Sequence, residues 1–79
     1  MVKFLRLPEA RASRGRSRSA HYSDIKNGTC TEPVALGARS VGWPDYEIEA
    51  LNAARVAGRS DDEIRDLVAR LHAARKATP

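Results

Sequence analysis

Residues 33–43 read Pro-Val-Ala-Leu-Gly-Ala-Arg-Ser-Val-Gly-Trp. Large apolar residues occupy alternate positions in each half of this stretch: Val34 and Leu36, then Val41 and Trp43. The connection between the halves contains Gly37 and one cation, Arg39, so the stretch predicts a short β-hairpin with a basic tip. We expect its apolar side to pack on the helices that follow. Phe4–Leu5, near the start of the chain, is a candidate for a further short strand.

The segment before the hairpin has the pattern of two helices joined by a tight turn. Pro8 suits the first turn of a helix that runs to about Arg14. Ser17 is placed to cap a second helix that runs to about Asn27, and Gly28 follows where a left-handed residue commonly ends a helix. This order predicts a helix-turn-helix. A basic hairpin beside such a unit suits contact with a phosphate backbone, while the second helix contacts base edges.

The segment after the hairpin predicts a helical hairpin. Pro44 opens a third helix, which has acidic residues in its first turn, where the helix dipole favours them. Its apolar stripe consists of Ile48, Leu51 and Ala54. Ser60 and Glu63 have the spacing of a capping box and open a fourth helix. The apolar residues of this helix recur at helical spacing: Ile64, Leu67, Val68 and Leu71.

Composition favours a small binding module over an enzyme. The chain has 79 residues and only 5% aromatics, too few large side chains for a deep catalytic cleft. The net charge is +4 and is unevenly distributed: residues 1–26 hold seven cations and two acidic residues, a net of +5. This asymmetry predicts an anionic partner, most plausibly nucleic acid, at the N-terminal half.

Other residue types exclude further classes of function. Cys30 is a single cysteine, so an intrachain disulfide is excluded and a reducing compartment, the cytoplasm, is expected. The sequence has no apolar run of the roughly 20 residues that a membrane span needs. His21 and His72 are far apart in sequence and lack neighbouring ligands, and Asp61–Glu63 suit a helix N-terminus, so we expect no metal, no cofactor and no catalysis.

Three segments together resemble the AlpA family of phage and prophage regulators, which are relatives of excisionases. They are Phe-Leu-Arg-Leu-Pro-Glu at residues 4–9, Ser-Arg-Ser followed by Tyr22, Ile25 and Lys26, and the hairpin of residues 33–43. Residues 47–65 are similar to the C-terminal extension of many members. The resemblance implies a mainly α fold with a small β-hairpin: a MerR-like winged helix-turn-helix at residues 1–57, and a C-terminal extension at 58–79 that completes a helical hairpin and packs on it.

The same resemblance implies the function and partners. The chain would bind double-stranded DNA in a sequence-specific manner, as a transcriptional activator or repressor of a prophage gene or as an excision factor that assists an integrase. Copies would bind DNA side by side. Arg16, His21 and Asp24 depart from the aliphatic residues that the family commonly has at these places. Because unpaired buried charge costs several kcal/mol, we expect the N-terminal half to be the less stable one.

Nine residues are candidates for contact with DNA: Arg16, Ser17, Arg18, Ser19, His21, Tyr22, Lys26, Arg39 and Ser40. Arg18 and Ser19 occupy the first turn of the second helix, where side chains reach base edges and arginine can bind guanine. Ser17 and Tyr22 are expected to bind phosphate, and His21 is expected to face the DNA. Arg39 is either a phosphate or minor-groove ligand or an ordinary exposed turn residue.

Two alternatives remain open on sequence grounds. A protein-binding adaptor or antirepressor could keep the winged-helix frame without contacting DNA, as the charged residues at positions 16, 21 and 24 suggest. An RNA-binding basic segment on a helical hairpin is a weaker option. Trp43 could stack on a base, but its alternation with Val41 favours a place in the core.

Overall fold

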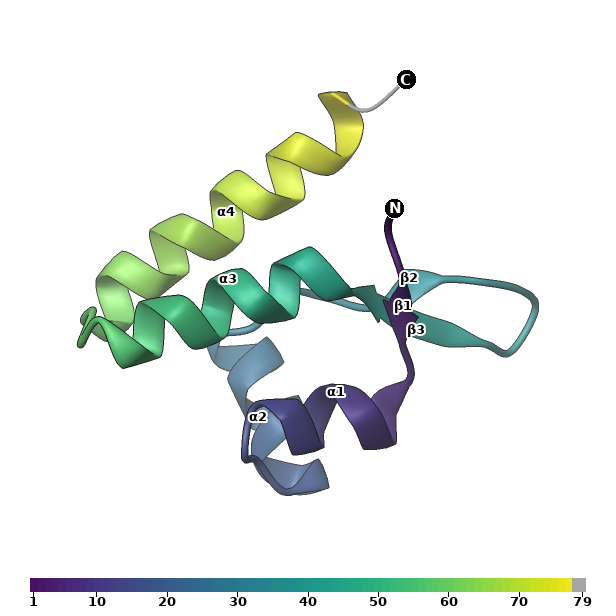
Figure 1. Cartoon of the computed structure of the whole chain (residues 1–79), viewed down its shortest axis with the longest axis horizontal. Helices are drawn as coiled ribbons and strands as arrows, with labels where there is room; N and C mark the ends of the chain where they lie inside the picture. Colours follow the sequence, from purple (N-terminus) through teal and green to yellow (C-terminus); the bar gives the residue numbers. More distant parts are fainter. Residues whose placement is uncertain (78–79) are drawn as a thin grey trace.

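The computed structural model describes residues 1–77, which form four helices and three short strands (Figure 1). In chain order the elements are β1 (Phe4–Leu5), α1 (Leu7–Ser13), α2 (Arg18–Asn27), β2 (Val34–Ala35), β3 (Val41–Pro44), α3 (Asp45–Val56) and α4 (Asp61–Ala77). The fold is therefore mainly helical with a small antiparallel sheet, as predicted, and is compatible with a winged helix-turn-helix. Within residues 1–77, no helix has the length and apolar character needed to cross a bilayer.

The predicted helix-turn-helix is formed by α1 and α2. Pro8 lies in the first turn of α1, and Gly15 takes a left-handed conformation (φ 68°) in the turn that follows. The Ser17 hydroxyl caps α2 by accepting a hydrogen bond from the Ala20 N–H at 3.2 Å. Gly28 ends α2 with φ 83°, where a side chain would strain the backbone. The local signals in the sequence thus place both helices within about a residue.

The three strands form one antiparallel sheet in the order β1-β3-β2. Leu5 of β1 pairs with Trp43, which confirms the predicted N-terminal strand. Val34 of β2 pairs with Gly42, and the Leu36 N–H donates to the Ser40 carbonyl near the hairpin turn. We call residues 34–44 the wing.

The two apolar pairs of the wing point to opposite sides of the sheet. Directly paired residues share a face, so Val34 and Leu36 lie on the side of Gly42, and Trp43 lies on the other side. Trp43 is fully buried, whereas Leu36 and Val41 are 40% and 37% exposed. The expectation that the apolar side of the wing packs on the following helices is therefore wrong for its outer half, which extends away from α3 and α4 (Figure 1).

The helical hairpin of α3 and α4 forms as predicted. The Glu63 N–H donates to the Ser60 hydroxyl at 3.2 Å, and the Ser60 N–H donates to the Glu63 carboxylate at 3.0 Å, which completes the capping box. The buried apolar side chains form one cluster drawn from most of the chain: Ala10, Cys30, Trp43, Ile48, Leu51, Ile64 and Val68. Trp43 lies within this core, and its indole N–H donates to the Thr31 carbonyl at 2.8 Å.

Candidate nucleic-acid interface

The outward face of α2 is polar and basic. Arg18, Tyr22 and Lys26 are exposed and lie four residues apart, so they follow one line along the helix. Arg18 and Lys26 take part in none of the ion pairs formed within residues 1–77. This face therefore offers two cations and a phenol that have no competing partner in the described part of the chain.

The hydroxyl residues of α2 extend this face. Ser19 is exposed beside Arg18, and Ser23, four residues further on, is exposed as well. Ser23 is absent from the sequence-based candidates, although the spacing of four from Ser19 could have identified it. Ser17 is exposed, and its hydroxyl oxygen accepts the capping hydrogen bond from Ala20. A hydroxyl can donate while it accepts, so capping leaves Ser17 free to donate to a phosphate.

Arg16, in the turn before α2, belongs to a cluster of charged side chains with Arg14 and Asp24. Its Nε and Nη2 donate to the two carboxylate oxygens of Asp24, each at 2.9 Å, and Arg14 Nη2 donates to Asp24 Oδ2 at 2.9 Å. The side chain of Arg16 is 45% exposed, while that of Arg14 is only 5% exposed. The expectation that residues 16 and 24 bury unpaired charge is thus wrong, because Arg16 pairs with both oxygens of Asp24 and Arg14 adds a third hydrogen bond.

The ion pairs also fix the protonation of Asp24. Burial alone would raise the pKa of this carboxyl, but hydrogen bonds from Arg16 and Arg14, together with their positive charges, outweigh that effect. The pKa of Asp24 lies below its ordinary value as a result. The same contact with Asp24 raises the pKa of Arg16.

His21 is in the core and does not face outward, so the expectation that it contacts DNA is wrong. It is 0% exposed, and its ring meets that of Trp43 edge-on with the centroids 4.7 Å apart. Its Nδ1 lies 2.8 Å from Nη1 of Arg14 and must accept, since arginine only donates. Burial, followed by the charge of Arg14, lowers the pKa of His21 and favours the neutral ring. No local pattern around His21 indicates that Arg14, seven residues earlier, holds this ring.

The wing presents the remaining two candidates. Arg39 is exposed at the tip, and Ser40 is half-buried with its carbonyl occupied by the Leu36 N–H at 2.7 Å. Helix α1 contacts both α2 and β3, so it sets the separation between α2 and the wing (Figure 1). Most of the nine sequence candidates are exposed residues of α2 and its cap. The others are the exposed Arg39 and half-buried Ser40 of the wing, the partly engaged Arg16 and the buried His21.

Comparison with known proteins gives the following matches. The family model described as prophage CP4-57 regulatory protein (AlpA) matches residues 3–55, which include β1, both helices of the helix-turn-helix, the wing and nearly all of α3. The chain is similar to the uncharacterized protein ORF88 of Enterobacteria phage P4, with 42% identity over 57 residues. The match covers 72% of this chain and 65% of that protein, so the chain spans just under two thirds of the length of this relative. No solved structure matches significantly.

Proposed function

This chain belongs to the AlpA family of prophage regulatory proteins, and from that premise we propose that it is a DNA-binding regulator in which α2 enters the major groove. One observation carries the proposal: the outward face of α2 offers Arg18, Tyr22 and Lys26 without an acidic partner inside the described chain. A helix of this kind in a helix-turn-helix is the element that contacts base edges.

The proposed contacts follow from position along α2. Arg18 lies in the first turn and contacts a base edge, where a guanidinium can form two hydrogen bonds with guanine. Ser17 and Tyr22 bind backbone phosphates, and Lys26 neutralises a phosphate nearer the end of the helix. Ser19 and Ser23 are placed for the same groove. Arg16 has Nη1 left after its two contacts with Asp24, and this group can reach a phosphate.

The wing and α4 complete the proposed arrangement. Arg39 and Ser40 contact the backbone or the minor groove beside the site of α2. Residues 1–57 act as the winged helix-turn-helix DNA-binding domain, and residues 58–79 as a supporting extension. The regulator activates or represses a phage or prophage gene, or assists an integrase in excision, with copies bound side by side on the DNA.

A mobility-shift assay at several salt concentrations tests the proposal. It compares the affinity for DNA that flanks the gene encoding this chain with the affinity for random duplex DNA. If about five phosphates are neutralised, the logarithm of the affinity falls against the logarithm of the salt concentration with a slope of roughly −4 to −5. Arg18→Ala weakens binding to the preferred site by about 1–3 kcal/mol and reduces specificity. Arg39→Ala weakens binding to all sequences alike.

Arg70→Ala is the matched control, because Arg70 is an exposed arginine on α4, outside the proposed interface. It removes the same charge and leaves site preference unchanged. A flat salt response contradicts the proposal. Equal behaviour of the wild type, Arg18→Ala and Arg39→Ala would instead favour the protein-binding adaptor, and preference for RNA over duplex DNA would favour the RNA-binding alternative.

A further inference from the structure

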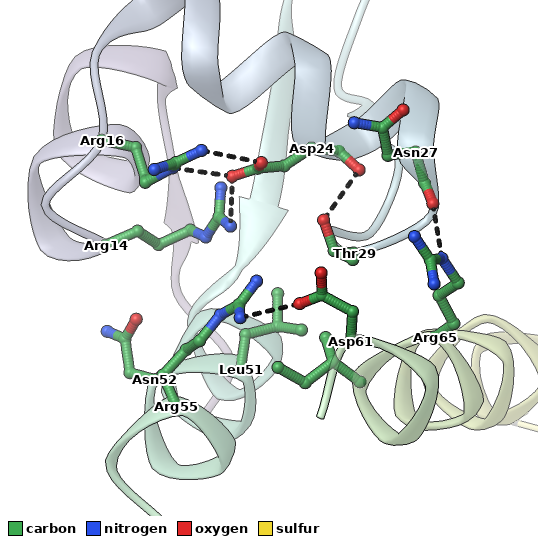
Figure 2. A pocket seen from close by; sticks show the side chains of 11 residues that line it. Arg14, Arg16, Asp24, Asn27, Thr29, Leu51, Asn52, Arg55, Asp61 and Arg65 are labelled. Atoms are coloured by element: carbon green, nitrogen blue, oxygen red, sulfur yellow. Dashed lines mark hydrogen bonds and ion pairs between the residues drawn. The ribbon is translucent and has the colours of Figure 1, made fainter. Parts of the chain in front are cut away.

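A polar pocket of about 530 Å³ lies on the side of α2 that faces α3 and α4 (Figure 2). The turn after α1, the second half of α2, α3 and the start of α4 all contribute to its wall. Leu51 and Ile64, both members of the core, close it from beneath. The pocket has the volume of a small-molecule site, and none of the proposed DNA contacts other than Arg16 lines it.

The charged residues of the pocket wall are mainly arginines. They are Arg14, Arg16, Arg55 and Arg65, with Asp24 and Asp61 as the two carboxylates. Four cations and two anions give the wall a formal net charge of +2. A wall of this charge, set partly away from solvent, favours an anion over a neutral or cationic ligand.

The carboxylates do not exhaust the hydrogen-bonding capacity of the arginines. Asp24 is almost fully buried beneath Arg14 and Arg16, so its charge is already neutralised before a ligand approaches. Arg55 uses only Nη1, which donates to Asp61 at 3.1 Å. Each guanidinium has five N–H donors, so Arg55 keeps donors that form no hydrogen bond within the described chain.

Two hydrogen bonds hold the Arg65 side chain in place, and nearly half of that side chain remains exposed to solvent. Its Nε donates to the Asn27 carbonyl at the end of α2, at 2.9 Å, and its Nη1 donates to Asp62 at 2.9 Å. The side chains of Arg55 and Arg65 are 48% and 45% exposed. Exposed ion pairs of this kind contribute little, so their carboxylate partners give way to a doubly charged ligand at small cost.

From this arrangement we propose that the pocket binds a small phosphate monoester, whose dianionic phosphate contacts Arg55 and Arg65. Guanidinium groups match phosphate oxygens in geometry as well as charge, because two parallel N–H donors meet two oxygens. The pocket is larger than a bare phosphate ion requires, so the ester portion occupies the remainder. Such a ligand bridges the helix-turn-helix and the α3–α4 hairpin, and it stabilises their packing when bound.

The proposal is tested by titrating the ¹⁵N-labelled full chain with inorganic phosphate, AMP and adenosine at constant ionic strength. Phosphate and AMP shift the side-chain amide signals of Asn27 and Asn52, which line the pocket, in a saturable manner, and adenosine does not. Thermal unfolding provides a second measurement. Several-fold excess of AMP over its dissociation constant raises the midpoint by about 4–8 °C.

Variants that remove a positive or a negative charge from the pocket wall distinguish a specific binding site from general effects of salt. Arg55→Gln and Arg65→Gln each weaken phosphate and AMP binding by about tenfold, since each removes charged hydrogen bonds. Asp61→Asn strengthens binding, because it removes the competing partner of Arg55. The matched controls are Arg59→Gln and Asp66→Asn, which make the same charge changes outside the pocket and leave the affinity unchanged. Circular dichroism verifies that each variant is folded.

The results that overturn the proposal are equally distinct. A linear, non-saturating response, or equal affinities in the pocket variants and their controls, shows that the anion acts on the protein surface in general. If Arg55→Gln and Arg65→Gln instead weaken DNA binding and lower its salt slope while free phosphate gives no response, the phosphates belong to DNA and the free-ligand site is rejected. Arg18→Gln, which removes a proposed DNA contact outside the pocket, leaves AMP binding intact. Loss of AMP binding in this variant would contradict a separate pocket site.

Discussion

Asp24 shows how a charged residue is accommodated among the buried residues of a small domain. Its carboxylate accepts three hydrogen bonds from two arginines, one almost fully buried and one half-exposed. A buried carboxylate is tolerated only when its charge and lone pairs are satisfied, and here they are. The two buried residues of α2, His21 and Asp24, are both polar and both contact Arg14.

Unequal burial of the two arginines leads to a prediction about stability. Arg14→Ala is expected to lower the free energy of unfolding by about 1.5–3 kcal/mol, because it removes charged hydrogen bonds to the buried Asp24 and His21 while Arg16 still pairs with Asp24. Arg16→Ala is expected to cost about 1 kcal/mol, since water can replace much of that contact. Urea unfolding curves measure both. Equal costs for the two variants would contradict the assignment of Arg14 as the buried member.

The buried histidine predicts a pH dependence of stability. The folded state holds the pKa of His21 below its ordinary 6.5, through burial and then the nearby charge of Arg14. As the pH falls below 6.5, the unfolded chain binds a proton that the folded chain does not, so the free energy of unfolding decreases. Asp24, whose folded pKa is also depressed, causes a second loss only below its ordinary 3.8.

Equilibrium unfolding between about pH 7 and pH 5 tests the histidine effect, because Asp24 remains ionised throughout that range. His21→Gln is expected to flatten the dependence of stability on pH, even though the variant is less stable at neutral pH. His72→Gln leaves His21 in place and serves as the matched variant. An unchanged slope in His21→Gln would assign the acid sensitivity to other groups.

At the scale of elements, α4 is joined to α3 by a buried ion pair near its C-terminal end. Arg75 Nε donates to Glu47 Oε2 at 2.8 Å, and Arg75 Nη2 donates to Glu47 Oε1 at 2.6 Å. The same Nη2 contacts the Glu32 carbonyl, and the Glu32 N–H donates to His72 Nε2 at 3.0 Å. The loop before β2 is thereby held by two residues of α4. These polar contacts hold the C-terminal part of α4 against α3 and this loop.

Removal of this contact is expected to be costly. Glu47 is 0% exposed, so Arg75→Ala leaves a buried carboxylate without its cation and lowers the free energy of unfolding by about 3–5 kcal/mol. Arg75→Lys restores only part of this, because an ammonium cannot donate to both oxygens in parallel. Arg70→Ala, an exposed change on the same helix, stays within about 0.5 kcal/mol. Chemical denaturation of the three variants gives the comparison, and a complete rescue by lysine would argue against the bidentate geometry.

At the scale of the whole molecule, the sequence predicts what depends on neighbouring residues and misses what depends on distant ones. The end of α2 at Gly28 follows from a residue that favours left-handed backbone, and the start of α4 after Ser60 follows from a capping box. Both signals are local. The buried place of His21 depends on Arg14 and Trp43, which come from other elements. The role of Arg75 follows from Glu47, 28 positions earlier, a pairing that no periodic pattern reveals.

The distribution of the core raises the question of whether residues 1–57 can fold alone. The family match ends at residue 55, yet the core cluster includes Ile64 and Val68 of α4. Burial of these two side chains contributes about 1.5–3 kcal/mol each, and the ion pair of Glu47 adds to this. Small domains are stable by only about 5–15 kcal/mol in total. The support from α4 is therefore comparable to the whole stability of the chain.

A chain ending at Gly58 is accordingly expected to lose its cooperative thermal transition and the dispersion of its amide NMR spectrum. It would lose Ile64 and Val68 from the core cluster that includes Ile48 and Leu51, and it would leave Glu47 without Arg75. A chain ending at Lys76 keeps all of these contacts and should unfold like the full sequence. If the shorter chain instead unfolds cooperatively and binds DNA with the same salt slope, residues 1–57 form an independent domain and α4 serves a separate purpose. The end of the family match would then coincide with the end of a folding unit. The core cluster, which continues into α4, argues against this.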